Sequence, residues 1–95
     1  MTEDQATVYA WQRKMFPRSN RAGQEGKLFE EVQELKSDLM YDPKNSGPEM
    51  ADVVIVLYGL ASMLGIDLHE EINKKMDVNR HRTWEIQPDG TGRHL

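Results

Sequence analysis

Two sets of acidic residues at helical spacing are the part of this sequence best suited to chemistry. The first set is Glu30-Glu31-x-x-Glu34 and the second is Glu49-x-x-Asp52. Residues three or four positions apart lie on one side of a helix, so each set would present its acids together. Two helices that direct such sets towards each other would form a cluster of oxygen ligands, which suits Mg²⁺ or Mn²⁺.

Several of these acids are expected close to the apolar faces of their helices. At about 100° per residue, Glu31 lies on the flank of a stripe that contains Leu28 and Leu35. Glu49 and Asp52 share a face with Val56. A carboxylate drawn towards a core must be paired, protonated or bound to a metal. Divalent cations would satisfy all of these acids together, whereas salt bridges with nearby lysines would satisfy part of the cluster. Those lysines are Lys27, Lys36 and Lys44.

Four segments of the chain have patterns typical of helices, and they must position the acids. Apolar residues recur at helical intervals, and prolines, asparagines and glycines separate the segments. The second segment stops before Asp42-Pro43, because proline disfavours a helical residue before it. The expected helices span residues 3–16, 21–40, 49–64 and 67–81.

The third segment is apolar in all directions. Its run Val53–Val56 could by itself form a buried strand, but residues 49–64 are too long for a typical strand and are followed by Gly65. A helix that is hydrophobic all round is central, or shared between subunits. Residues 83–95 contain Pro88, Gly90 and Gly92 and are expected to be irregular, with their first part docked through Trp84.

Length and composition limit the classes of protein that fit. A chain of 95 residues predicts one domain, spanning residues 1–95. The absence of cysteine excludes disulfides and thiolate metal sites, which fits a reducing cytosol. The acidic start, Met1–Asp4, lacks the basic residues of a signal peptide, and the longest apolar run is too short to cross a membrane. A net charge of −4 argues against a general nucleic-acid binder.

The acidic sets together resemble the EExxE…ExxD signature of the MazG-like all-α nucleotide pyrophosphohydrolases. A second block, Lys75-Met76-x-x-Asn79-x-x-Arg82-x-Trp84, is similar to the C-terminal pattern of the branch that contains phage and bacterial dATP/dGTP pyrophosphohydrolases. The resemblance implies an all-α fold like a four-helix bundle, completed by assembly into a homodimer or homotetramer. It also implies cleavage of a nucleoside triphosphate to the monophosphate and pyrophosphate in the bacterial or phage-infected cytosol.

The resemblance assigns roles to the acids by position. Metal ligation, with two or more Mg²⁺ or Mn²⁺ ions, is implied for Glu31, Glu34, Glu49 and Asp52. Glu30 matches the first acid of the motif and is expected to orient the attacking water or support a ligand. Glu30, Glu31 and Glu34 are the expected catalytic residues. Such ions neutralise the charge that develops on a phosphoanhydride and lower the pKa of the attacking water.

Substrate phosphates also need positive partners. Lys75, Asn79 and Arg82 lie at i, i+4 and i+7, along one face of the fourth expected helix if that helix reaches Arg82. We expect these three residues, with Lys27 beside the acids, to bind substrate. An alternative is that the cations simply favour a helix C-terminus. Trp84 would either stack on a base or close the core.

Purine deoxynucleotides, dATP and dGTP, are the favoured substrates on the resemblance to the branch. A rival hypothesis is a pyrophosphohydrolase for another nucleotide, such as dCTP, dUTP or phosphoribosyl-ATP. A second rival, from a different class, is a non-catalytic helical oligomerisation or regulatory module. Metal-dependent turnover of a nucleotide panel distinguishes the three.

Overall fold

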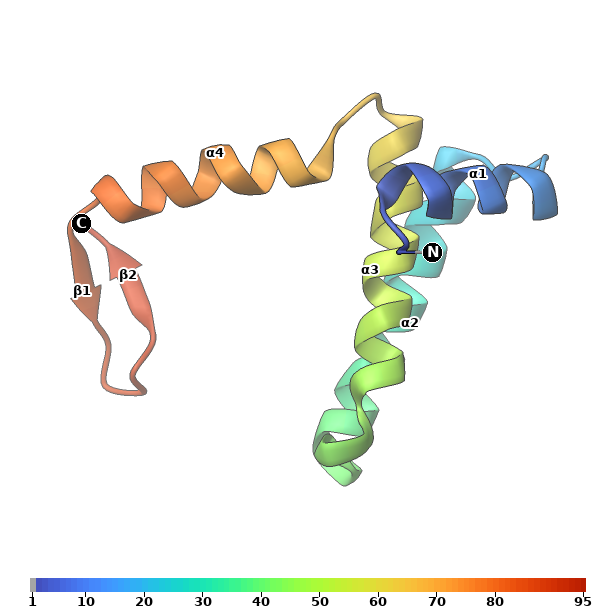
Figure 1. The fold of residues 1–95 in the computed structure, drawn as a ribbon. Helices are drawn as coiled ribbons and strands as arrows, with labels where there is room; N and C mark the ends of the chain where they lie inside the picture. Colours follow the sequence, from blue (N-terminus) through green and yellow to red (C-terminus); the bar gives the residue numbers. More distant parts are fainter. Residues whose placement is uncertain (1) are drawn as a thin grey trace.

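Helices account for most of the chain. The computed structural model describes residues 2–95, so Met1 of the expected N-terminal stretch lies outside the described residues. Figure 1 shows four α-helices followed by a short β-hairpin. The helices are α1 (Gln5–Met15), α2 (Arg21–Tyr41), α3 (Gly47–Met63) and α4 (Leu68–His81), with a single 3₁₀ turn, η1, at Pro43–Asn45. The expected all-α class is confirmed, and each helix lies where its sequence pattern predicts it.

Side-chain caps start three of the helices. In each case an Asp or Asn side chain accepts a hydrogen bond from the backbone N–H three residues later, which satisfies a donor that the helix itself leaves free. At α4 the capping residue is Asp67, whose Oδ1 atom accepts a hydrogen bond from the Glu70 N–H at 3.1 Å. The other two caps are Asp4 at α1 and Asn20 at α2.

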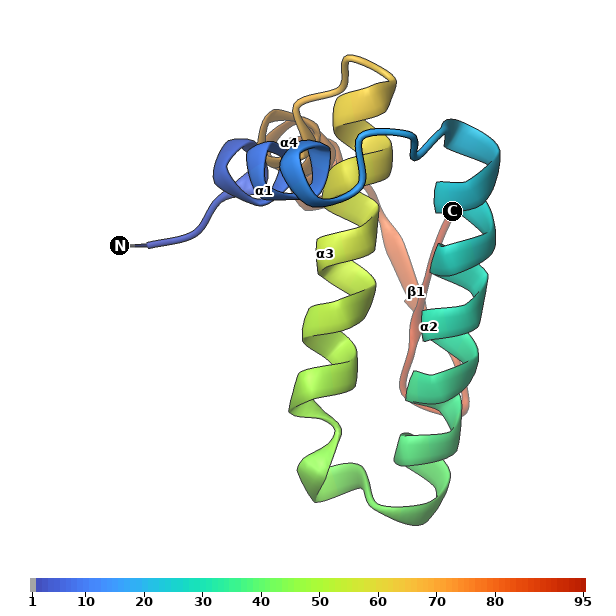
Figure 2. The same ribbon diagram turned by 90° about the vertical axis from the view of Figure 1, so that its right-hand side faces the viewer.

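Helices α1, α2 and α3 form the body of the molecule. Helices α2 and α3 run side by side in opposite directions, and α1 packs against the upper part of α3 (Figure 2). The buried apolar side chains of the described residues are Val56 and Ala61, both on α3. Helix α3 is therefore the central helix, as its all-round apolar sequence predicts.

The last 28 residues project from the body as an arm, defined here as residues 68–95. Helix α4 leaves the top of α3 at a bend of 100° and carries the hairpin at its far end (Figure 1). None of the described residues of α4 is buried. Within one chain, only three of the four expected bundle helices pack together, and completion of the bundle by assembly stays a prediction.

Gln5 fixes the point from which the arm leaves. Its Nε2 atom donates to Ser62 Oγ at 3.0 Å and to the Ile66 carbonyl at 2.7 Å. Its Oε1 atom accepts from the Leu68 N–H, the first residue of α4, at 2.8 Å. A single side chain of α1 thereby holds both ends of the turn between α3 and α4.

The C-terminal segment departs from the sequence-based expectation. Residues 83–95 were expected to be irregular, but they form an antiparallel hairpin of β1 (Trp84–Ile86) and β2 (Gly92–His94). Pro88 and Gly90, which suggested an irregular segment, lie in the turn between the strands, where Gly90 adopts a φ of 88°, whereas Gly92 begins β2. The Trp84 indole N–H donates to the Asn79 carbonyl at 2.7 Å and joins the hairpin to α4.

Among the described residues, no single helix is both long enough and apolar enough to cross a membrane. Only α3 and α4 taken together satisfy a test of length and composition, and they are sharply bent relative to each other.

Candidate metal centre

Carboxylates from α2 and α3 meet on one side of the body. One oxygen from each of Glu31, Glu49 and Asp52 lies within 4.8 Å of the others. Glu31 comes from the middle of α2, whereas Glu49 and Asp52 occupy the first turns of α3. The two helices run antiparallel, and the short connection through η1 brings the start of α3 back beside α2. The expected meeting of the two acidic sets is thus present in the described structure.

Two oxygens of this cluster are buried without a hydrogen-bond partner. They are Glu31 Oε2 and Glu49 Oε2. Only 6% of Glu31 is exposed, so its charge is largely removed from water. A buried acceptor left without a partner is costly, more so when it is charged. The donor set is entirely carboxylate oxygen, so these residues fit a hard divalent cation such as Mg²⁺ or Mn²⁺.

The pKa values of Glu49 and Glu34 are both raised, but for different main reasons. Desolvation, followed by repulsion from Asp38 and Asp52, raises the pKa of Glu49. A side-chain hydrogen bond with Glu31, followed by repulsion from that carboxylate, raises the pKa of Glu34. Two carboxylic groups in contact do not both ionise readily, because like charges repel. A bound cation would favour the ionised form of each.

Lys27 satisfies part of the cluster. Its Nζ atom lies 3.0 Å from Glu31 and 3.7 Å from Glu30. The hydrogen bond from Lys27 lowers the pKa of Glu31, and the same bond raises the pKa of Lys27. The salt-bridge alternative is therefore realised for one oxygen of Glu31 and leaves the other oxygen without a partner. Among residues 2–95, neither Lys36 nor Lys44 forms an ion pair with the cluster.

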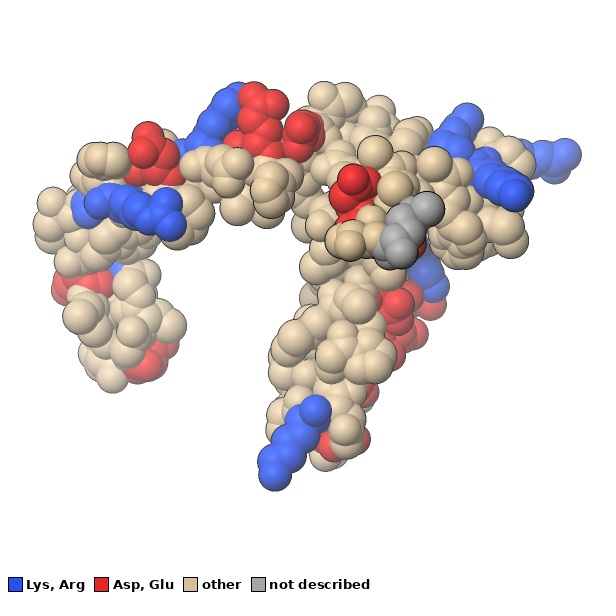
Figure 3. All heavy atoms as spheres, in the orientation of Figure 1, with Lys and Arg blue, Asp and Glu red and all other residues tan. Residues whose placement is uncertain are grey.

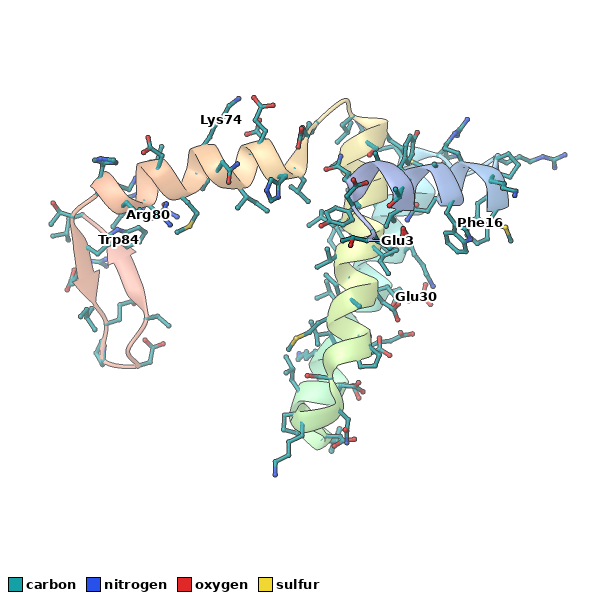
Figure 4. The ribbon with its side chains drawn as sticks, viewed as in Figure 1. Glu3, Phe16, Glu30, Lys74, Arg80 and Trp84 are labelled. Carbon is teal, nitrogen blue, oxygen red and sulfur yellow. The ribbon has the colours of Figure 1, made fainter. Side chains whose placement is uncertain are left out.

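Glu30 and Glu34 lie at the rim of the cluster. Both residues are exposed on α2, and Figure 4 labels Glu30 beside the paired helices α2 and α3. Acidic side chains continue along this part of the body below α1 (Figure 3). Glu34 is close enough to Glu31 and Glu49 for both of these carboxylates to raise its pKa, so it adjoins the clustered acids from the solvent side.

A cavity of about 910 Å³ opens beside the acids. Glu31, Asp52 and Lys27 are among the residues that line it, as are Trp11 and Phe16. The volume is within the range of small-molecule sites. Two further lining residues, Gln12 and Gln24, were missed in the sequence analysis. The available signal was a polar residue at a helical core position: Gln12 lies four residues after Val8, and Gln24 four before Leu28.

The remaining expected substrate-binding residues lie on the arm. Lys75 and Asn79 are in α4, and Trp84 begins the hairpin. Arg82 directly follows α4 in extended backbone, so it does not continue the helical face as expected. In Figures 1 and 4 this end of the arm is remote from α2 and α3, so a single chain does not bring these residues to the acids. The basic residues Lys74 and Arg80, labelled in Figure 4, likewise lie along α4. Lys74 forms an ion pair with Glu70 at 3.1 Å.

Comparison with known proteins gives a consistent set of relatives. A dATP/dGTP diphosphohydrolase of cyanophage S-2L is 38% identical over the whole of this chain and 88% of its own length. A dATP/dGTP diphosphohydrolase of Salmonella phage PMBT28 is 32% identical over 96% of the chain, which spans only 30% of that longer protein. No protein-family model matches the chain.

A solved structure has the same fold. It is the cyanophage S-2L MazG-like pyrophosphohydrolase, bound to dGDP and three catalytic Mn²⁺ ions per active site. The two structures superpose with a TM-score of 0.74 and 36% sequence identity, over 96% of this chain and 92% of the other. Because identity and coverage are both high, the likeness extends beyond general helical architecture.

Proposed function

Because the chain belongs to the dATP/dGTP diphosphohydrolases of the MazG-like superfamily, we propose that it hydrolyses dATP and dGTP to the monophosphate and pyrophosphate. The observation that carries this proposal is the meeting of Glu31, Glu49 and Asp52 within 4.8 Å, with two buried oxygens unpartnered. Such a cluster suits divalent cations, which bind the phosphates of a nucleoside triphosphate and neutralise the charge that develops during hydrolysis.

The four acids at the junction of α2 and α3 would hold Mg²⁺ or Mn²⁺. These residues are Glu31, Glu34, Glu49 and Asp52. When bound, the cations supply charge neutralisation at the phosphates and a more acidic water. Glu30 lies one position before the buried ligand Glu31 and is exposed, so it is placed to accept a proton or orient a water at the rim. Glu30, Glu31 and Glu34 remain our proposed catalytic residues.

Lys27 is proposed to contact the substrate phosphates. Lys27 lines the cavity together with Glu31, and its Nζ atom lies 3.0 Å from that acid. In the absence of substrate, the ion pair with Glu31 holds this cation in place. Phosphate oxygens would offer it an alternative partner of the same charge and hydrogen-bonding type.

We further propose that the protein works as a homo-oligomer, a dimer or a tetramer. The chain exposes 7542 Å², whereas a compact monomer of its mass exposes about 5,600 Å². The excess, about 1,900 Å², is larger than the roughly 800 Å² that each partner buries in a standard interface. The radius of gyration is 16.1 Å, against about 12 Å for a compact domain of this length. The protruding arm accounts for this extended shape.

The exposed apolar face of α4, which would be buried by a second copy of the chain, also carries basic and polar side chains. Ile72 and Met76 are 51% and 39% exposed, and they lie at i and i+4 on α4. Lys75 and Asn79 lie on the same side of the helix by spacing. We propose that this face docks on a second copy and brings Lys75, Asn79 and Arg82 to the acidic site of that copy. The proposed stacking role of Trp84 depends on the same docking.

The relatives are phage proteins, and we propose that the reaction takes place in the cytosol of a bacterium or phage-infected cell. There it would remove purine deoxynucleoside triphosphates from the pool and supply the monophosphates.

Product analysis tests the proposed reaction directly. The full-length protein is incubated with each common NTP and dNTP in the presence of Mg²⁺ or Mn²⁺, and the products are identified by mass spectrometry. We expect dATP and dGTP to yield dAMP and dGMP with pyrophosphate, and chelation by EDTA to stop the reaction. Preferred cleavage of dCTP or dUTP would overturn the proposed substrate, and no metal-dependent turnover of any nucleotide would overturn the reaction.

A matched pair of variants tests the site. Asp52→Asn keeps the shape of the side chain and removes its charge, so we expect pyrophosphate release to be abolished while the circular dichroism spectrum is retained. Asp42→Asn makes the same change in the connection after α2, away from the clustered acids, and should retain turnover. Equal rates in Asp52→Asn and in the unmodified protein would refute the site.

A further inference from the structure

Basic side chains gather in one region of this otherwise acidic chain. Residues 5–24 contain four basic residues and no Asp or Glu, although the chain as a whole has a net charge of −4. All four are exposed, and they form what we call the basic patch: Arg13, Lys14, Arg18 and Arg21. The patch covers the end of α1, its connection to α2 and the first turn of α2, where Figure 3 shows basic side chains above the acidic ones of the body. Positive charge is therefore concentrated next to the acidic cluster.

Local stabilisation of the helices accounts for only part of the basic patch. Arg13 and Lys14 lie in the last turn of α1, where a cation complements the helix dipole. Arg21 forms an ion pair with Glu25 at 3.0 Å. Arg18 lies in the turn beyond α1, and within the described part of the chain neither it nor Arg13 forms an ion pair. The charges of these two arginines are thus not neutralised by any residue that the structure describes.

The same two arginines line the cavity beside the acids. Arg13 and Arg18 are among its lining residues, together with Lys27, Glu31 and Asp52. Carboxylates that attract metal ions also repel the phosphates of a nucleotide, and a nucleoside triphosphate stays anionic after one divalent cation has bound. Cations that line a cleft concentrate an anionic ligand there and can raise its rate of association about 10- to 1,000-fold. The two arginines are therefore placed to offset the repulsion from the acids.

We propose that the basic patch, chiefly through Arg13 and Arg18, steers the anionic nucleotide to the cavity by long-range electrostatic attraction. This inference rests on the proposed function, because the ligand that is attracted is the triphosphate substrate. The attraction acts on encounter and binding and leaves the chemical step unchanged, since neither arginine is a proposed metal ligand or catalytic residue. It therefore predicts an effect on kcat/KM that weakens as salt screens the charges, with kcat unaffected.

Removal of both charges tests the proposal. Turnover of dATP with saturating Mn²⁺ is measured for the double variant Arg13→Gln/Arg18→Gln and for the unmodified protein over a range of NaCl concentrations. At an ionic strength of about 20 mM the Debye length is about 20 Å, and we expect kcat/KM of the double variant to be about three- to tenfold lower, with the same kcat. At about 0.5 M the Debye length falls to about 4 Å, and the two proteins should then differ by less than about twofold.

Lys44→Gln/Lys74→Gln is the matched control. It makes the same change in net charge in η1 and in α4, which do not line the cavity, so its kcat/KM should follow that of the unmodified protein at every salt concentration.

Three outcomes would overturn the proposal. They are equal kcat/KM of Arg13→Gln/Arg18→Gln and the unmodified protein at low salt, an equal loss in the control, and a loss that persists at high salt or appears in kcat. The last would make an arginine a direct contact of the substrate. Absence of turnover by the unmodified protein with every nucleotide would instead overturn the proposed function, so the two failures are distinguishable.

Discussion

Glu31 is held in a nearly buried position by a lysine at one oxygen, while its other oxygen has no partner. The Lys27 Nζ atom is 3.0 Å from Glu31 Oε1, and Glu31 Oε2 is unsatisfied. A cation at the second oxygen would lie close to the lysine and be repelled by it. On the proposed function, Lys27 would stabilise the metal-free site and compete with the metal, a balance that suits reversible binding of a metal–nucleotide complex.

Replacing Lys27 by Met should separate these two effects. Loss of the lysine leaves the Glu31 charge without its partner, so the melting temperature in EDTA should fall. Mn²⁺ should bind up to about fivefold more tightly, because a neighbouring positive charge is removed. Calorimetric titration and thermal melts measure both effects. Lys36→Met, the same change in charge on α2, should alter neither, and weaker Mn²⁺ binding in Lys27→Met would contradict this account.

The acids of the site were predictable from sequence, whereas their partners were only partly so. Glu31, Glu49 and Asp52 stood out because spacing and apolar neighbours both marked them. Lys27 was identifiable by its i, i+4 relation to Glu31. Gln12 was not identified, because a glutamine beside an apolar stripe has no distinctive spacing, and its role depends on which carbonyl of α3 it meets.

Helix boundaries were largely determined by local chemistry. The Asp67 cap and the proline after Asp42 each act within a few residues, so the sequence alone predicts them. The hairpin was missed because its pairing, for example Trp84 with His94, depends on a turn at Gly90 that brings distant residues together. The direction of α4 depends on Gln5, 63 residues away from Leu68 along the chain.

Gln5→Leu tests whether this one side chain sets the direction of the arm. The substitution removes three hydrogen bonds and leaves the Leu68 N–H without its partner. We expect a loss of roughly 1–3 kcal/mol in the free energy of unfolding and weaker self-association, with Mn²⁺ affinity unchanged. Chemical denaturation and light scattering measure these quantities. Gln33→Leu, at an exposed position of α2, is the control, and identical behaviour of the two variants would contradict the proposed role of Gln5.

The hairpin turn should respond to acid through Asp89. Thr91 donates to Asp89 Oδ1 from its hydroxyl at 2.6 Å and from its backbone N–H at 3.0 Å. These bonds lower the pKa of Asp89. A lowered folded-state pKa means that the stabilisation is complete above the unfolded value of about 3.9 and is lost as pH falls through the folded value. NMR titration of the Asp89 carboxyl and the Thr91 amide should show this together, and a midpoint above 3.9 would contradict it.

At the scale of the whole molecule, one chain exposes more surface than a compact monomer of its mass, and this excess supports the proposed assembly. The sequence indicated this through the all-round apolar α3, on which Val54 is 43% exposed. It could not indicate that α4 would extend from the body and not fold back onto it. That outcome depends on the 100° bend between α3 and α4, which no local pattern specifies.

Ile72→Lys places a charge in the middle of the proposed docking face of the arm. We expect dissociation to monomers in light scattering and at least about a tenfold loss of kcat/KM, because burying an unpaired charge opposes assembly. Mn²⁺ binding to the acids of the body should persist. Glu70→Gln makes the same change in net charge on the opposite side of α4 and should remain assembled. Retention of both assembly and activity in Ile72→Lys would contradict the docking of the arm.

The central claim is that the carboxylates of α2 and α3 bind the cations on which hydrolysis depends. Its most direct test is an anomalous difference map, recorded at the manganese edge, from crystals of the protein grown with Mn²⁺. We predict at least one peak within coordination distance, about 2.0–2.4 Å, of oxygens from Glu31, Glu49 and Asp52. A map without a peak at these residues, from crystals whose dissolved protein hydrolyses dATP with Mn²⁺, would contradict the account.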